Sequence, residues 1–277
     1  MNDFVEKCNK LTNLIENCTK NDIVVAFSGG VDSSLLLEIA CKYAKNNNSK
    51  VYAVTFCSDM HSDKEMDFTY EIAKKTGAIH KIIQADVLNE AGIINNPPDR
   101  CYKCKKYMFT KICDYAKSVN AGCVIEGTNF DDLSCYRPGI RALKELNILS
   151  PLADAKMTKE DVRNMAKEYN IASSNKPSTP CFATRFEYGT ALNREDILKV
   201  EKAEEYIKSF GFYNVRVRVH GEIARIEVDS TDIPKLVNLR DEITTHLKNI
   251  GYKYVTVDLN GFKSGSMDKR IMQNSDI

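Results

Sequence analysis

A glycine- and serine-rich stretch, SGGVDSS at residues 28–34, has the composition of a phosphate-binding loop. Its glycines let the backbone approach a phosphate closely, and free N–H groups at the start of a following helix favour an anion. Asp32 would repel a bare phosphate, so it fits only if it holds Mg²⁺ or caps the helix. The residues that would contact the nucleotide are Ser28, Gly29, Gly30, Asp32, Ser33 and Ser34. The alternative is a tight strand-to-helix turn capped by serine.

This stretch is neither G-x-x-x-x-G-K-[ST] nor G-x-G-x-x-G. It resembles the SGGxDS loop of the ATP pyrophosphatases, which cleave ATP between its α- and β-phosphates and adenylylate a substrate. The resemblance implies an acyl- or imidoyl-adenylate and pyrophosphate as products, with Mg²⁺ neutralising the charge on the bridging oxygen. Enzymes of this kind pass the activated carbon to ammonia or to sulfur. The loop alone leaves both reactions open.

A cysteine pair, Cys101 and Cys104, opens a predicted helix just after the turn-like stretch NNPP. Lys105 and Lys106 follow directly and would attract sulfide or an ATP phosphate. The local sequence is compatible with a redox dithiol, with half of a metal site, or with two thiols on one helical turn.

A further cysteine, Cys181, lies in the small-residue stretch CFATR, close to Arg185. A thiol near a cation has a lowered pKa and is a better nucleophile. We therefore expect Cys181 and Arg185 to act in catalysis, the alternative being a buried structural cysteine.

The sequence contains ten cysteines, more than core packing requires. In a reducing compartment they are not expected to form a disulfide framework, and metal or catalytic use is favoured. Four lie in or beside apolar helix-like or strand-like segments and are expected to be small buried hydrophobes: Cys41, Cys57, Cys113 and Cys123. The sequence suggests no partner for Cys8, Cys18 and Cys135.

Strands alternate with helices over the first part of the chain, which predicts an α/β fold with a doubly wound, mainly parallel sheet. The expected strands are residues 22–27, 51–56, 80–87 and 122–129. Expected helices precede the first strand, follow the SGGVDSS loop, and cover residues 62–76, 101–118 and the stretch after the N-cap Thr158. Ligands bind at the C-terminal ends of such strands. Glu126 and Asn129, at the end of the fourth strand, are therefore predicted to bind ATP.

The composition changes at residues 175–190, which are rich in loop formers. Beyond them we expect a small α+β domain of order αββαβ. Its elements are a helix at 193–210, strands at 213–219 and 223–228, a helix at 232–248 and a strand at 253–259. We place the domain boundary so that residues 1–188 bind ATP and residues 189–277 bind substrate or support oligomerisation.

The charge balance excludes some partners. The formal net charge is +1, from 39 basic and 38 acidic residues, so the totals imply no pull toward nucleic acid or a membrane surface. No apolar run approaches the roughly 20 residues of a membrane helix, and the N-terminal stretch lacks the apolar core of a signal peptide. We expect a cytoplasmic protein that acts on a small molecule, with no nucleic-acid or membrane partner.

Longer stretches carry a more specific resemblance: EGTNFDD, KPSTPCFATRFEYG, RVRVHGEIARIEV and DLNGFKSGSM, together with SGGVDSS. They look like the LarE family of ATP-dependent sulfur transferases over essentially the whole chain. The resemblance implies that the enzyme adenylylates a carboxylate of a pyridinium biscarboxylate mononucleotide and converts it to a thiocarboxylate, a step in making the nickel-pincer nucleotide cofactor. It also implies ATP, Mg²⁺ and inorganic sulfide, and a homo-oligomer, by family habit a hexamer.

The resemblance offers two sulfur routes. In one branch of the family the cysteine of the PCxATR motif, here Cys181, gives up its own sulfur and becomes dehydroalanine. In another branch a CxxC pair and that cysteine hold a [4Fe–4S] cluster, which matches Cys101, Cys104 and Cys181. Three thiolates would leave one iron open for hydrosulfide, and our interpretation favours this branch. A zinc site, which needs a fourth ligand, and a redox dithiol are the remaining alternatives.

An acidic substrate of this kind requires converging arginines. Arg216 and Arg218 alternate on a predicted strand and share one face, and they resemble the RVR pair that binds substrate phosphate in the family. Glu204 and Glu227 resemble acidic positions near the substrate or a divalent ion. Without the resemblance these side chains would be interpreted as an exposed strand face and solvated charges. Weaker candidates are Arg137 and Arg141.

Two other functions remain open at this point. A tRNA-thiolating enzyme would use the same activation step on a base carbonyl, and it would need a basic patch or an RNA-binding domain. A nucleotide-binding module would sense ATP or AMP without chemistry. Release of pyrophosphate in the presence of substrate separates the sensor from both enzymes.

Overall fold

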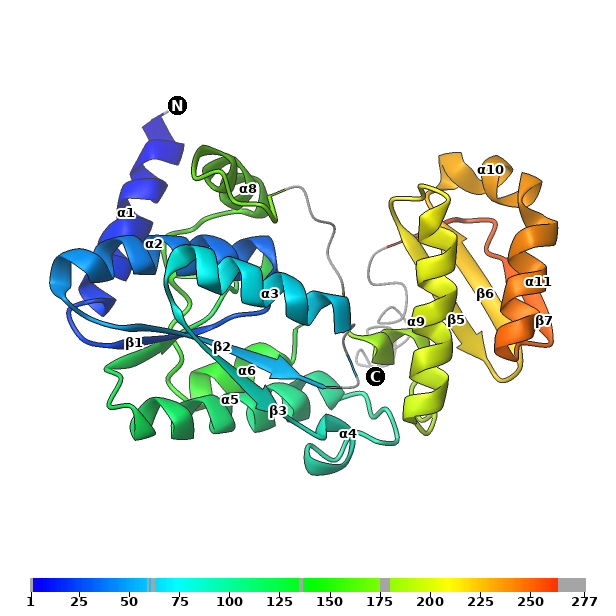
Figure 1. The fold of residues 1–277 in the computed structure, drawn as a ribbon, viewed down its shortest axis with the longest axis horizontal. Coiled ribbons are helices and arrows are strands. Elements are labelled where there is room, and N and C mark those ends of the chain that lie inside the picture. Colours follow the sequence, from blue (N-terminus) through cyan, green and yellow to red (C-terminus); the bar gives the residue numbers. More distant parts are fainter. Residues whose placement is uncertain (1, 59, 61–62, 135–136, 175–179, 264–277) are drawn as a thin grey trace, which may run out of the picture. The chain divides into compact units, whose positions relative to one another are not determined.

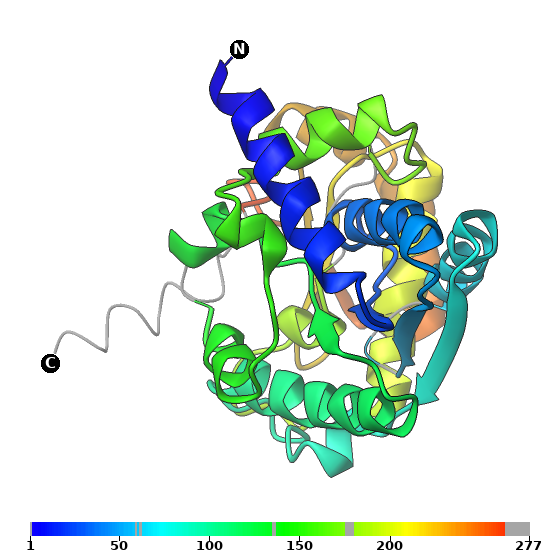
Figure 2. The same ribbon diagram turned by 90° about the vertical axis from the view of Figure 1, so that its left-hand side faces the viewer.

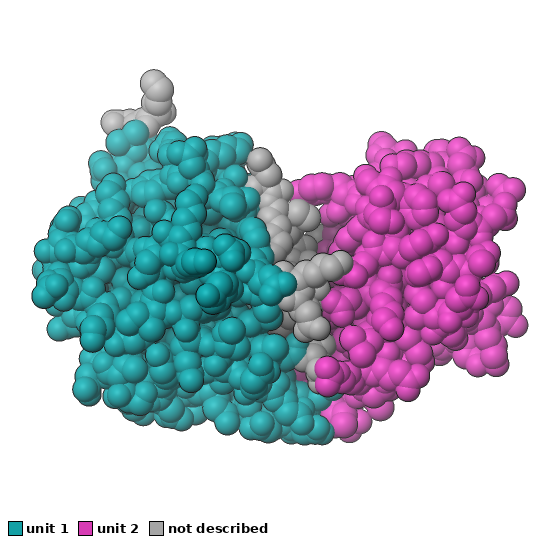
Figure 3. All heavy atoms as spheres, viewed as in Figure 1, with its two compact units in different colours: residues 1–58, 62–91, 99–178 teal, residues 59–61, 92–98, 179–277 magenta. Residues whose placement is uncertain are grey.

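The structure is a computed structural model that describes residues 2–58, 60, 63–134, 137–174 and 180–263. The chain divides into two compact units, coloured separately in Figure 3. Unit 1 comprises Met1–Ser58, Ser62–Ala91 and Asp99–Ser178, and unit 2 comprises Asp59–His61, Gly92–Pro98 and Thr179–Ile277. The boundary expected after residue 188 falls inside unit 2, which also takes in two short segments from earlier in the chain.

Unit 1 is built on a parallel sheet with the strand order β3-β2-β1-β4. Its elements are α1 (Asn2–Cys18), β1 (Ile23–Ala26), α2 (Val31–Asn47), β2 (Val51–Cys57), α3 (Asp63–Thr76), β3 (Ile79–Gln84), α4 (Val87–Glu90), α5 (Arg100–Ser118), β4 (Cys123–Ile125), the 3₁₀ turn η1 (Asp131–Ser134), α6 (Gly139–Glu145), α7 (Pro151–Asp154) and α8 (Lys159–Glu168). The predicted α/β class is confirmed.

The sheet of unit 1 separates two apolar cores, because neighbouring strand residues point to opposite faces. Val25 of β1 packs with Leu36 of α2 in one core, together with α1 and α8. Val24 packs with Phe109 of α5 in the other. Figures 1 and 2 show α1 and α2 on one side of this sheet and α5 on the other. Both faces are covered, as expected for a parallel sheet.

The order of the strands brings the candidate ATP residues to one edge of the sheet. β1 and β4 are adjacent and parallel, with Val25 paired to Ile125. Both strands therefore end at the same edge, where β1 leads into the SGGVDSS loop and β4 into the stretch EGTN. Thr158 caps α8 as predicted, because its side chain accepts from the Asp161 N–H in a reciprocal capping box.

Unit 2 contains a three-stranded sheet of order β5-β6-β7, antiparallel between β5 and β6 and parallel between β6 and β7. Its elements are the 3₁₀ turn η2 (Phe182–Arg185), α9 (Arg194–Ser209), β5 (Val215–His220), β6 (Ile223–Val228), η3 (Ser230–Asp232), α10 (Ile233–Asn238), α11 (Arg240–Ile250) and β7 (Tyr254–Val257). The α+β arrangement is as predicted. The helix expected at 232–248 is instead two helices, since the chain tightens into a 3₁₀ turn at Leu239.

Some expectations lie outside the described residues: the loop at 175–179, Cys135 and the chain after residue 263. In the part of the chain that the structure describes, no helix is long and apolar enough to cross a membrane.

Candidate active site

The SGGVDSS loop joins β1 to α2 through a backbone that requires glycine. Gly29 has a φ of +72°, and a Cβ at this position would lie 2.9 Å from the Thr69 Cγ2 atom. Gly30 is the N-cap of α2, a helix of 17 residues. The first N–H groups of α2 have no partners within the helix, and the helix dipole makes this end positive. The loop therefore ends in a geometry suited to an anion.

The serines of the loop hold it closed. The Ser33 hydroxyl donates to the Gly30 carbonyl (3.2 Å) and accepts from the Ser28 N–H (3.3 Å). The Ser28 and Ser33 hydroxyl oxygens lie 3.2 Å apart. Ser34 is buried, and its hydroxyl has no hydrogen-bond partner among the described residues. Ser28 is the exposed hydroxyl of the three, so it is the one best placed to meet a phosphate.

Asp32 is held by two side chains from other elements. The Asn129 amide donates to one carboxylate oxygen (3.2 Å), and the Lys159 ammonium forms an ion pair with the other. Asp32 makes no side-chain cap of α2, so of its two predicted roles the capping role is wrong. The structure thus brings Asp32 and Asn129 together and adds Lys159, which the sequence did not single out.

Glu126 organises the end of β4. Its carboxylate accepts from the Thr128 N–H (2.9 Å), the Thr128 hydroxyl (2.8 Å) and the Ser150 hydroxyl (2.6 Å). The Lys105 ammonium lies 3.5 Å from it. Since Lys105 directly follows Cys104, this ion pair connects the N-terminal part of α5 to the ATP edge of the sheet.

Gly127 lies against the phosphate loop. A Cβ on Gly127 would stand 3.1 Å from both the Asp32 Cβ and the Ser33 backbone nitrogen. We expect Gly127→Ala to shift the loop and to raise the KM for ATP about tenfold, because small displacements of binding groups are costly in rate. Pyrophosphate release at varied ATP concentration measures this.

A matched control is Gly77→Asn. Gly77 has a φ of +79° with open space around it, and asparagine tolerates that conformation. It should leave the KM unchanged. An unaltered KM in Gly127→Ala would mean that this contact does not shape the ATP site.

The Cys101–Cys104 pair occupies the first turn of α5. Cys101 is exposed and Cys104 half-buried. A spacing of three places both thiols on one helix face. Lys103 is within 3.1 Å of Asp99 and Lys106 within 2.7 Å of Glu145, so part of the local positive charge is paired. Among the described residues no group of three or more His, Cys, Asp or Glu side chains is gathered as a metal site, and Cys181 belongs to unit 2.

The other described cysteines are free thiols. Of the four cysteines expected to be small buried hydrophobes, Cys41 is buried, whereas Cys57, Cys113 and Cys123 are only half-buried. Burial raises the pKa of Cys41 to about 11 and also raises the pKa of Cys113. Cys18 corrects a prediction, because its thiol has a partner. A hydrogen bond with Cys123 lowers the pKa of Cys18 and raises the pKa of Cys123.

Cys181 and Arg185 lie at the two ends of one tight turn in unit 2. The Arg185 guanidinium is 1% exposed and binds Glu204 through two parallel hydrogen bonds (2.7 and 2.9 Å). It also donates to the Pro180 carbonyl (3.1 Å) and the Thr184 hydroxyl (2.7 Å). Arg185 therefore holds the backbone around Cys181, and its charge is largely balanced by Glu204. The Cys181 sulfur lies 3.6 Å from the Met60 sulfur.

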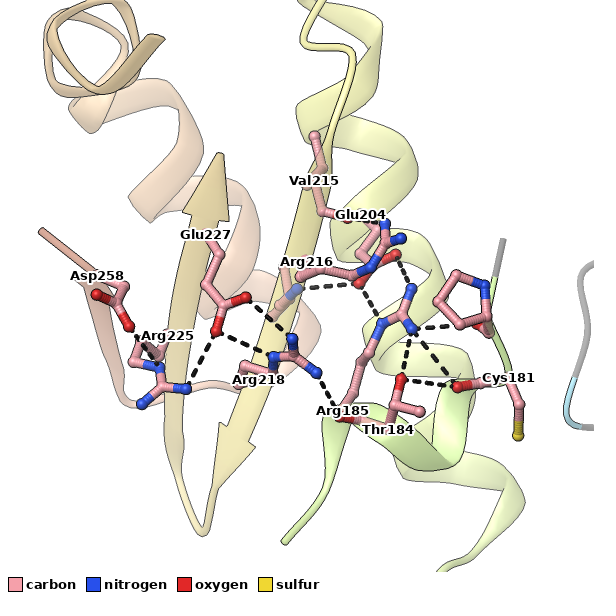
Figure 4. A network of polar contacts seen from close by, with 12 residues as sticks. Cys181, Thr184, Arg185, Glu204, Val215, Arg216, Arg218, Arg225, Glu227 and Asp258 are labelled. Carbon is pink, nitrogen blue, oxygen red and sulfur yellow. Dashed lines mark hydrogen bonds and ion pairs between the residues drawn. The ribbon is translucent and has the colours of Figure 1, made fainter. Parts of the chain in front are cut away.

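The arginines of β5 extend this network (Figure 4). Arg218 binds Glu227 through two hydrogen bonds of 3.0 Å, and it also donates to the Thr184 carbonyl. Arg216 is 5% exposed, and its guanidinium lies 5.0 Å from the Phe262 ring. Burial and the neighbouring Arg185 lower the pKa of Arg216 to about 10.

These side chains are not on a solvated surface. Arg218 is 5%, Glu204 1% and Glu227 2% exposed, so the alternative of exposed charges is wrong. Arg137 and Arg141, the weaker candidates, are exposed in unit 1 and pair with Asp132 (2.7 Å) and Glu145 (3.4 Å). The residues of unit 2 that were predicted to bind the acidic substrate thus lie together with the turn that carries Cys181.

A parallel sheet with a closed SGGVDSS loop between β1 and α2 defines an ATP-binding PP-loop enzyme, and the family model of the PP-loop domain matches residues 4–100. A pyridinium-3,5-bisthiocarboxylic acid mononucleotide synthase of Lactiplantibacillus plantarum is 37% identical over 89% of this chain and 88% of its own. The chain belongs to the family of that synthase, the LarE family. An uncharacterised protein of Methanocaldococcus jannaschii is 35% identical over 94% of this chain and 99% of its own. An uncharacterised protein of Synechocystis is 34% identical over 89% of this chain and 91% of its own length.

Proposed function

We propose that this enzyme adenylylates a carboxylate of a pyridinium biscarboxylate mononucleotide with ATP and converts it to a thiocarboxylate, for the nickel-pincer nucleotide cofactor. We further propose that sulfur is delivered through a [4Fe–4S] cluster held by Cys101, Cys104 and Cys181. The relative from L. plantarum carries the product of such a reaction in its name, which supports the substrate class.

One observation carries the proposal: the turn bearing Cys181 and the buried arginines form a single hydrogen-bonded network in unit 2. Arg185 binds the backbone beside Cys181 and Glu204, and Glu204 accepts from the Val217 N–H of β5 (3.0 Å). Arg218 joins the same turn through the Thr184 carbonyl. A sulfur-bearing residue and a group of buried arginines in one network suit sulfur transfer to an acidic nucleotide.

The network contains more cations than carboxylates. Its members are Arg185, Lys208, Arg216, Arg218 and Arg225 against Glu204, Glu227 and Asp258. Burial disfavours the charged form of Arg216, and the positive charge of Arg185 disfavours it further. A substrate phosphate would offset both effects, so we assign Arg216 and Arg218 to phosphate and Glu204 and Glu227 to holding these arginines in place.

ATP would be activated at unit 1. The N–H groups at the start of α2 and the Ser28 hydroxyl would hold the β- and γ-phosphates. A substrate carboxylate oxygen then attacks the α-phosphorus, the α–β bridging bond breaks, and pyrophosphate leaves with the bond electrons. Asp32, held by Asn129 and Lys159, would bind Mg²⁺, and the ion supplies charge neutralisation on the leaving phosphates.

The thiols of α5 suit a soft metal centre. Cys101, which is exposed, and Cys104, which is half-buried, place two thiols at the start of α5. This is the positive end of the helix, where thiolates are favoured. With Cys181 as a third thiolate, a [4Fe–4S] cluster would supply an iron with an open position for sulfide. Sulfur attack at the acyl carbon then expels AMP and leaves the thiocarboxylate.

The test is product analysis under anaerobic conditions. The protein is loaded with iron and sulfide and then given ATP, Mg²⁺, sulfide and the pyridinium biscarboxylate mononucleotide. Pyrophosphate, AMP and the thiocarboxylate are quantified by chromatography and mass spectrometry. The proposal expects all three in equal amounts, each dependent on the mononucleotide.

Two results would point elsewhere. Pyrophosphate release that depends on tRNA, with tRNA binding that weakens steeply with salt, would favour tRNA thiolation. ATP binding with no pyrophosphate release under any of these conditions would favour a nucleotide-binding module.

A further inference from the structure

Asn96 is a buried polar residue that sequence reasoning did not single out. It is 0% exposed and has a φ of +45°. Asparagine is among the few residues that tolerate this left-handed conformation. The segment Gly92–Pro98 that contains it belongs to unit 2 although it precedes Cys181 by more than eighty positions.

The Asn96 amide nitrogen donates to a cluster of backbone carbonyls. The acceptors are the oxygens of Ala183 (3.3 Å), Phe186 (3.1 Å) and Glu187 (2.9 Å). Three facing oxygens fix the orientation of the amide, because its own oxygen would be repelled there. The main-chain carbonyl of Asn96 also accepts from the Gly189 N–H (3.1 Å). Asn96 thus holds residues 183–189 through hydrogen bonds of its side chain and its backbone.

The Ala183 carbonyl lies within η2, and the Phe186 and Glu187 carbonyls lie just beyond its end. The Ala183 and Glu187 carbonyls each also accept a backbone hydrogen bond, from the Phe186 N–H (3.3 Å) and the Thr190 N–H (3.2 Å), so the Asn96 amide adds a second donor to both. At the opposite end of this turn, Arg185 donates to the Pro180 carbonyl (3.1 Å) and the Thr184 hydroxyl donates to the Cys181 carbonyl (2.9 Å). The turn that carries Cys181 is therefore fixed at one end by its own side chains and at the other by Asn96.

We propose that Asn96 is a positioning residue for the Cys181 thiol. By holding the carbonyls after η2 it keeps the turn closed and directs the Cys181 sulfur toward Met60, whose sulfur lies 3.6 Å away and whose carbonyl accepts from the Phe182 N–H (3.3 Å). The effect on sulfur transfer rests on the proposed function, whereas the position of the thiol does not.

The test uses Asn96→Asp and Asn96→Gly in the full chain. The aspartate keeps the shape of the side chain but replaces the donor with an oxygen acceptor that faces three carbonyl oxygens, and the glycine keeps the positive φ but removes all three side-chain hydrogen bonds. Asn120→Asp is the control, because Asn120 also has a positive φ (+53°) but is exposed. The rate of alkylation of Cys181 by iodoacetamide is followed by peptide mass spectrometry, with Cys113 as an internal reference.

Both Asn96 variants should raise the alkylation rate of Cys181 at least about tenfold, since the lost hydrogen bonds no longer oppose opening of the turn. Cys113 and the Asn120→Asp protein should not change. In the turnover assay kcat for thiocarboxylate should fall by a similar factor, with the first-turnover rate of pyrophosphate release unaltered. If Asn96→Asp does not fold, Asn96→Gly carries the test.

An alkylation rate of Cys181 within twofold of wild type in Asn96→Gly would overturn the proposal. A wild-type protein that forms no thiocarboxylate would instead overturn the proposed function, and the alkylation result would still decide whether Asn96 positions the thiol.

Discussion

Replacing Cys181 with alanine is expected to abolish thiocarboxylate formation while the first-turnover rate of pyrophosphate release stays within about twofold of wild type. Cys181 belongs to unit 2, whereas the phosphate loop and its partners Asn129 and Lys159 belong to unit 1. Removing the thiol should therefore spare the adenylylation step and stop sulfur transfer. Loss of an essential group of this kind typically lowers the affected step by about a thousandfold or more.

The Cys101→Ala and Cys104→Ala proteins separate the two sulfur routes. If all three thiols hold a cluster, each variant loses bound iron and sulfide and multiple-turnover sulfur transfer. Cys113→Ala is the matched control, because Cys113 lies in the same helix but packs against the apolar core. A Cys101→Ala protein that binds iron and sulfide as wild type does would contradict the cluster.

The second large effect concerns stability. Glu204→Gln should destabilise unit 2 by about 3–5 kcal/mol, because it leaves the charge of buried Arg185 without its carboxylate. Glu204 and Arg185 are 1% exposed each, so solvent cannot replace the lost partner. Glu204 also accepts from the Val217 N–H, so the change also perturbs a hydrogen bond to strand β5. Urea unfolding followed by circular dichroism measures the free energy.

Glu195→Gln provides the comparison. Glu195 pairs with Lys199 at 2.9 Å on the same helix, but its side chain is 80% exposed. Exposed pairs contribute little, so this variant should unfold at the wild-type midpoint. Equal midpoints for Glu204→Gln and Glu195→Gln would show that the buried pair does not hold unit 2 together.

Much of the fold follows from the sequence because its periodicity is strong. The apolar runs at β1 and β2 and the capping signal at Thr158 predict elements that the structure contains. The helix at 232–248 was predicted unbroken because no proline or glycine lies at the break. Helix α6 (Gly139–Glu145) was missed, since it is short and follows a polar loop.

The ATP edge could be anticipated for a topological reason. Parallel neighbours end at one edge, so the segments after β1 and β4 had to meet. The sequence did not reveal which side chains would pair there. Lys159 reaches Asp32 across 127 positions, and Lys105 reaches Glu126 across 21. Such pairs depend on how the helices pack on the sheet, and the local sequence pattern does not encode this packing.

The buried charges show the other limit of sequence reasoning. Glu204 lies on a helix among other charged residues, and only the three-dimensional structure shows that it points to Arg185 inside the unit. Asn96 gave no signal, because two asparagines before two prolines are typical of a loop. Its role appears only when the segment around it packs against the stretch after Cys181.

The most direct measurement is mass spectrometry of the protein and product after prolonged anaerobic reaction with ATP, Mg²⁺, sulfide and substrate. The proposed route predicts several thiocarboxylates per chain and a Cys181 peptide of unchanged mass. One thiocarboxylate per chain, with loss of H₂S from Cys181 to leave dehydroalanine, would contradict it.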